Sequence, residues 1–140
     1  MAYESITHEY EYLDASRKGF GIPGLLQLLE DVAEDTYLRQ LDIGYNMTAD
    51  DVLDNRDIEF FFKKLKFNLS RNKTLTALDM AGNHLFDHFP HPTNEHTKNY
   101  VIELANILSN KSKITHVDLS ENNIAGIGAS IKRNLSLSSV

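Results

Sequence analysis

Residues 114–124 read ITHVDLSENNI, and their spacing of apolar and polar side chains recurs three times earlier in the chain. Apolar residues occupy the first, fourth, sixth and last positions of this stretch, with Asp at the fifth and Asn at the ninth. Residues 75–85 (LTALDMAGNHL) keep every position, and residues 38–48 (LRQLDIGYNMT) depart only at the last. Residues 10–20 (YEYLDASRKGF) are a weaker copy, with Lys18 in place of the Asn. Because these copies begin 28, 37 and 39 residues apart, we interpret them as successive structural repeats.

This spacing resembles that of leucine-rich repeats, in which a short strand, a turn and a helix form a unit whose apolar side only a neighbouring unit can cover. The 28-residue first unit, with Gly24 six residues after the Asn position, is similar to the ribonuclease-inhibitor class of that family. The resemblance implies an α/β fold: a right-handed solenoid in a horseshoe arc, with short parallel strands on the concave face and helices on the convex face. Asn46, Asn83 and Asn122 are expected to bond buried backbone groups where each strand ends.

The length of 140 residues, 41% of them hydrophobic, predicts a single domain with its own core. We expect repeats at about 8–35, 36–72, 73–111 and 112–134, and the start of a fifth at 135–140. Residues 133–140 repeat the spacing that precedes the third strand, which predicts an uncapped apolar strand at this end. Since terminal repeats normally carry a polar cap, we expect a fragment of a longer array, or a second chain that covers this end.

Each of the four repeats is predicted to contain a helix, from apolar residues that recur every three or four positions. In the third repeat it is expected at about 97–108, and in the fourth a short helix is expected to contain Ile131 and Leu135. The first has Pro23 in its first turn and a buried stripe made of Leu25, Leu28, Leu29 and Val32. The second, at about 57–72, buries Ile58, Phe61, Phe62, Leu65 and Leu69. Phe60 and Phe67 lie on the opposite side of this helix. They are expected either to lie under an insertion from a neighbouring repeat or to anchor another protein.

The composition argues against several classes of function. A net charge of −6 disfavours binding to nucleic acid or to an anionic membrane. No apolar run approaches a membrane span, and the N-terminal residues lack the pattern of a signal peptide. With no cysteine, the chain has neither disulfides nor thiolate ligands. We therefore expect a cytoplasmic protein without a cofactor, and Asn46 at a buried position argues against glycosylation of its N-x-T triplet.

Two clusters of polar residues invite a sharper interpretation. Histidines 84, 88, 91 and 96 lie within 13 residues, and imidazoles can bind zinc, although their spacing matches no known motif. We favour a surface loop over a metal site formed by His84, His88, His91 and His96. Acidic residues crowd the end of the first helix, as a solvated helix end or as a docking patch for a basic partner: Glu30, Asp31, Glu34 and Asp35.

The resemblance implies a non-enzymatic scaffold that binds a partner protein, or further repeats of the same array, through its concave strands. The side chains expected on that face are Tyr12, Asp14, Gln40, Asp42, Ala77, Asp79, His116 and Asp118. We expect local polar groups, more than a cationic partner, to hold the four aspartates. A side surface formed by Phe60, Phe67 and the histidine-rich loop is expected to add to partner binding. The alternative is a GTPase activator on the same repeat, for which Arg17 and Tyr45 are the candidate functional residues, or an actin regulator.

Overall fold

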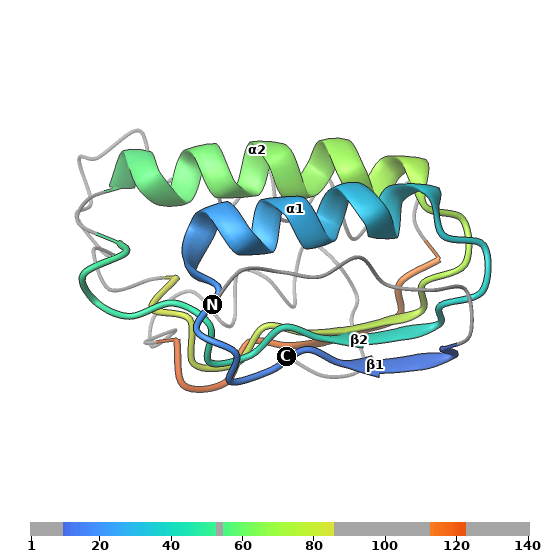
Figure 1. Cartoon of the computed structure of the whole chain (residues 1–140), viewed down its shortest axis with the longest axis horizontal. Coiled ribbons are helices and arrows are strands. Elements are labelled where there is room, and N and C mark those ends of the chain that lie inside the picture. The colour runs from blue at the N-terminus through green and yellow to red at the C-terminus, as the bar shows by residue number, and fades with distance from the viewer. Residues whose placement is uncertain (1–9, 53–54, 86–112, 123–140) are drawn as a thin grey trace.

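A computed structural model of the chain describes residues 10–52, 55–85 and 113–122 and shows two layers. One layer is a sheet of short strands, and the other consists of two helices that lie side by side above it (Figure 1). Along the chain the elements are β1 (Tyr12–Asp14), α1 (Gly21–Glu34), β2 (Gln40–Asp42), α2 (Asn55–Arg71), β3 (Ala77–Asp79) and β4 (His116–Asp118).

The four strands form a parallel sheet in the order β1-β2-β3-β4. Their central residues Leu13, Leu41, Leu78 and Val117 are aligned across the sheet. Each of these residues occupies the fourth position of its repeat, so the repeat spacing fixes the register. Parallel strands, of which the first three are joined through α1 and α2, confirm the predicted α/β repeat fold.

The helices bury the predicted stripes against the sheet. Every apolar residue expected on the inner side of either helix is at most 1% exposed. In α1, Pro23 lies in the first turn, where its missing N–H costs no helical hydrogen bond. The second helix begins at Asn55 and ends at Arg71, a shift of one or two residues from the predicted range. Phe61 and Phe62, whose ring centroids are 5.9 Å apart, are fully buried at the centre of this core.

Buried asparagines connect each repeat to the one before it. Asn46 accepts a hydrogen bond from the N–H of Lys18 at 3.0 Å and donates to the carbonyl of Ala15 at 2.8 Å. Asn83 accepts from the N–H of Asn46, and Asn122 accepts from the N–H of Asn83, both at 2.8 Å. All three asparagines are at most 2% exposed. This ladder confirms the role predicted for the Asn position.

A second pair of buried polar residues, Asp35 and Asn72, forms hydrogen bonds to backbone groups in the turns that follow α1 and α2. Asp35 accepts the N–H groups of Tyr37 and Leu38 at 2.7 and 2.6 Å. Thirty-seven residues later, Asn72 accepts the N–H of Leu75 at 2.7 Å and donates to the carbonyl of Asp35 at 3.3 Å. Asp35 is only 3% exposed. Its assignment to a solvated acidic patch was therefore wrong, because its carboxylate holds the turn from α1 into β2.

Several predicted features lie outside the described residues. They are the loop with His88, His91 and His96, the helices expected in the third and fourth repeats, and the strand expected at the C-terminal end. In the described ranges, no helix is both long and apolar enough to cross a membrane.

Candidate functional site

The side of the sheet turned away from α1 and α2, here called the open face, carries two rows of side chains. Because neighbouring residues of a strand point to opposite sides, the first and third residues of each strand share this face. The strand register aligns the first residues in one row and the third residues in a second row. The structure thus brings together all eight predicted residues: Tyr12, Gln40, Ala77 and His116 in one row, and Asp14, Asp42, Asp79 and Asp118 in the other.

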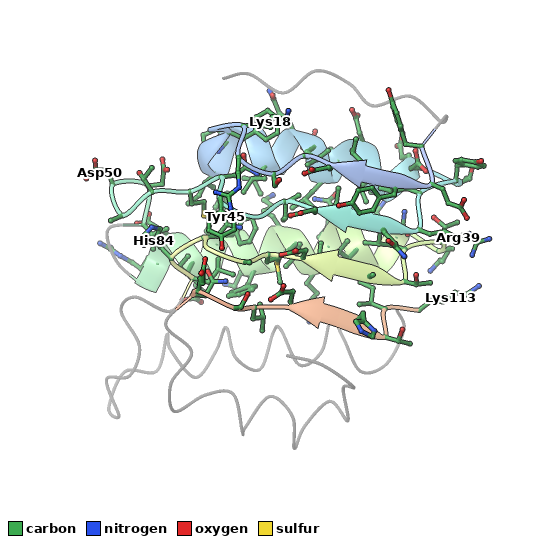
Figure 2. All side chains as sticks on the ribbon, turned by 90° about the horizontal axis from the view of Figure 1, so that it is seen from below. Lys18, Arg39, Tyr45, Asp50, His84 and Lys113 are labelled. Carbon is green, nitrogen blue, oxygen red and sulfur yellow. The ribbon has the colours of Figure 1, made fainter. Side chains whose placement is uncertain are left out.

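The open face is hollowed along the middle of the sheet. A depression of about 200 Å³ is lined by residues of all four strands, and the central Leu41, Leu78 and Val117 contribute to its lining. Tyr12 is 53% exposed beside this hollow. None of the helices that the structure describes covers this side, as Figure 2 shows from below the sheet. The face therefore presents apolar and polar surface together.

Each aspartate of the row uses one carboxylate oxygen to accept hydrogen bonds within the turn that follows its strand. Oδ1 of Asp42, Asp79 and Asp118 each accepts a backbone N–H two residues further on, at 2.9 Å. Asp14 accepts the N–H of Ser16 at 3.0 Å and its hydroxyl at 2.5 Å. These short-range bonds begin the turn that follows each strand. They confirm that local polar groups hold the row.

The row is also electrostatically uneven. Burial raises the pKa of the Asp79 carboxyl, and the charges of Asp42, Asp118 and Asp14 raise it further. At the edge of the sheet, the hydrogen bonds from Ser16 lower the pKa of Asp14. The ion pairs between described residues leave these four aspartates unmatched, since they join Arg39 to Glu11, Lys63 to Glu59 and Arg71 to Glu34. The centre of the row is thus the place where a positive charge would be stabilised most.

The turns that follow the strands form a ladder of their own. The residue three positions after each aspartate has a positive φ, between 55° and 68°: Arg17, Tyr45, Gly82 and Glu121. The guanidinium carbon of Arg17 lies 3.9 Å from the centre of the Tyr45 ring. The hydroxyl of Tyr45 donates to the carboxylate of Glu121, two repeats away. The ring of Tyr45 lies against Gly82, and a Cβ atom added to Gly82 would collide with this ring.

The structure therefore brings the two candidate residues of the activator hypothesis, Arg17 and Tyr45, into direct contact. The structure also shows that Gly82 and Glu121 belong to this ladder of turns, although the repeat spacing alone did not identify them as candidates. The signal was present in the sequence, because all four residues occupy the same repeat position. Figure 2 places the labelled Lys18, Tyr45 and His84 along this same edge, where the strands end.

The predicted side surface is separate from the open face. Phe60 is 50% exposed and Phe67 is 60% exposed. The hollows beside these rings are lined only by residues of α1 and α2. The insertion of the neighbouring third repeat, at 86–96, lies outside the described residues, so the expectation that it covers these rings stays a prediction. The helix layer carries Phe60 and Phe67 while the strands carry the open face, and partner binding by these two rings stays a prediction.

Of the histidine cluster, the structure describes only His84, which has a positive φ of 58° in the turn after β3. Among the residues that the structure covers, no three His, Asp or Glu side chains are placed to hold a metal ion. The proposed ligands on the 86–96 loop lie beyond those residues.

A family model of the leucine-rich repeat matches residues 71–87 and 110–130. These two segments are leucine-rich repeats. The matched ranges contain β3 and β4 and the buried Asn83 and Asn122, which are the residues that join these two repeats. Leucine-rich-repeat domains generally mediate protein–protein interaction and are typically not enzymes. A comparison of the sequence with curated proteins gives no significant match.

Proposed function

We propose that this leucine-rich-repeat protein is a non-enzymatic scaffold that binds a partner protein through the open face. In this proposal the repeats, at about 8–35, 36–72, 73–111 and 112–134, stack into a right-handed solenoid of the ribonuclease-inhibitor-like class. The strands then line the concave side and the helices line the convex side. Further repeats beyond these would lengthen the same surface. The proposal places this interaction module in the cytoplasm.

The observation that carries the proposal is the open face itself. It combines an apolar hollow, an exposed tyrosine and a row of carboxylates, all positioned by a sheet whose register the asparagine ladder fixes. Tyrosine is enriched at protein interfaces because its ring is large and its hydroxyl can still form hydrogen bonds. The strands hold these groups in place before binding, so that little ordering of the scaffold opposes association.

The charge of this face favours one kind of partner. Four aspartates in register repel phosphate groups, which argues against nucleic acid. A protein segment with lysine or arginine side chains would neutralise the row and would lower the pKa of Asp79. Such complementarity accelerates association and makes it sensitive to salt.

The chain offers a matched pair of sites for the decisive experiment. Gln40 is exposed on the open face, and Gln27 is exposed on α1 in the other layer. A photo-crosslinking amino acid replaces either glutamine, and the two proteins are irradiated in extract from the source cells. We expect Gln40 to yield a defined partner, which then binds the purified chain in calorimetry, whether or not Gln27 also crosslinks to it. Crosslinks from Gln27 alone would contradict binding through the open face.

A second candidate, the GTPase activator, is favoured by one observation: Arg17 and Tyr45 are stacked at the exposed edge of the turns. Such an activator needs a cation held where a bound nucleotide could reach it. Its test is nucleotide hydrolysis by a panel of small GTPases with the wild-type chain, Arg17→Ala and the neighbouring Lys18→Ala. Our scaffold proposal expects no stimulation by any of the three, and stimulation lost only in Arg17→Ala would favour the activator.

A further inference from the structure

A hollow of about 320 Å³ lies between α1 and α2, in the layer opposite the open face. Acidic residues of α1 line one side, and basic residues of α2 line the other, together with an aromatic ring and an amide. The lining residues are Glu30, Asp31, Glu34, Lys64, Phe67, Asn68 and Arg71. None of them belongs to the open face, so this hollow is independent of the proposed function.

An unpaired acceptor forms part of this hollow. Asn68 is only 3% exposed, and its Nδ2 donates to the carbonyl of Lys64 at 3.0 Å. Its Oδ1 has no hydrogen-bond partner in the part of the chain that the structure describes. Buried amide oxygens are almost always paired, because water is no longer available to them. Because Asn68 lines the hollow and its Oδ1 is covered, a ligand that displaces the exposed side chains around it can supply the missing donor.

Two further groups in the lining are suited to the same ligand. Phe67 exposes 60% of its surface. Glu30 is exposed on the neighbouring helix and forms none of the ion pairs found between described residues. A ring face, a carboxylate and an amide oxygen together match a planar cation that carries several N–H donors.

Arg71 already shows how a guanidinium binds in this environment. Its guanidinium carbon lies 5.6 Å from the centre of the Phe67 ring, and its Nη2 lies 3.2 Å from Oε1 of Glu34. Both side chains of this ion pair are largely exposed, at 45% and 76%, so the contact is weak. Arg71 can therefore turn outward when a second cation arrives, and so can Lys64, whose side chain is exposed.

We propose that this hollow binds an arginine side chain of a partner protein. The arriving guanidinium stacks on Phe67, donates to Oδ1 of Asn68 and pairs with the carboxylate of Glu30. Lysine fits less well, because its ammonium has neither a planar face nor donors in a fork. The site thus selects arginine by shape, in addition to charge.

The test uses three capped five-residue alanine peptides whose central residue is arginine, lysine or citrulline. Each is titrated into the ¹⁵N-labelled chain at constant ionic strength, while the side-chain amide of Asn68 is followed by NMR. We expect the arginine peptide to bind with a Kd in the millimolar range, and lysine to bind about three- to five-fold more weakly. Citrulline, which keeps the plane but lacks the charge, should bind most weakly. Equal responses to arginine and lysine, or no response at Asn68, would overturn the proposal.

Matched variants separate the site from general charge attraction. Phe67→Ala and Asn68→Leu should each remove the preference for arginine over lysine. Phe60→Ala should retain it, because Phe60 lines a different hollow with Ile22 and Pro23. If Asn68→Leu does not fold, Glu30→Gln takes its place and should weaken arginine binding by about three-fold. A preference that survives Phe67→Ala would show that the hollow does not recognise arginine.

Discussion

At the scale of single residues, Asn83 shows how much of the fold depends on one side chain. Its Oδ1 accepts the N–H groups of Asn46 and Met47, and its Nδ2 donates to the carbonyls of Ile43 and Met80. Asn83→Leu keeps a similar volume but leaves these buried groups unpaired. We expect it to lower the free energy of unfolding by roughly 2–4 kcal/mol in urea denaturation.

The control for this substitution is Gln27→Ala on the exposed side of α1, which should change the free energy of unfolding by less than about 0.5 kcal/mol. If both variants unfold at the same urea concentration, the ladder does not stabilise the repeats as described.

Two aspartates of the row should respond to pH in opposite ways. The folded-state pKa of Asp79 is raised by burial and by its neighbours Asp42, Asp118 and Asp14, so its stabilising contribution is present below its unfolded pKa and is lost as pH rises through the folded pKa. The pKa of Asp14 is lowered by Ser16, so its contribution is present above its unfolded pKa and is lost as pH falls through the folded pKa.

At neutral pH, Asp79→Asn should therefore stabilise the chain and Asp14→Asn should destabilise it. Asparagine retains an oxygen for the turn in both positions and removes only the charge. Urea midpoints measured between pH 3 and pH 7 provide the test. The prediction fails if the two variants shift the midpoint at neutral pH in the same direction.

At the scale of elements, the turns after the strands depend on Gly82. Its φ is +68°, and the ring of Tyr45 occupies the space that a side chain would need. Gly82→Ala should cost roughly 2–3 kcal/mol, because it adds a collision to the conformational strain. It should also separate the hydroxyl of Tyr45 from Glu121, which is visible as a change in tyrosine fluorescence.

Gly19 provides the comparison, since its φ is +66° but no atom lies within 4 Å of the place where its Cβ would be. Gly19→Ala should therefore lower the free energy of unfolding only through conformational strain, by about 1 kcal/mol. Equal losses at the two glycines would mean that the contact with Tyr45 contributes nothing.

The sequence predicted the helices and strands correctly where their buried residues recur at a regular period. The buried stripe of α1 from Leu25 to Val32 follows from the helical period, and the open-face rows follow from the two-residue period of a strand. The Tyr45–Glu121 bond and the buried Asp35 were not predicted. They depend on side-chain directions and on contacts between repeats, which hydrophobic periodicity does not encode.

At the scale of the whole molecule, the two layers give the chain two different surfaces. The strands present a fixed, acidic face with an apolar hollow, and the helices present a groove with exposed rings. Buried asparagines connect consecutive repeats, so neither surface can form from one repeat alone. The open-face proposal thus depends on the order and register of the four strands, and the hollow depends on the packing of α1 against α2.

The most direct test of that register uses engineered disulfides, because the natural chain has no cysteine. Tyr12→Cys with Gln40→Cys, and Gln40→Cys with Ala77→Cys, place cysteines on adjacent strands, about 4.8 Å apart. Tyr12→Cys with His116→Cys places them three strands apart, beyond the reach of a disulfide. On mild oxidation, the first two variants should form an intramolecular disulfide and the third should remain reduced. A disulfide within single chains of the third variant, or none in the first two, would contradict the structure on which the open face depends.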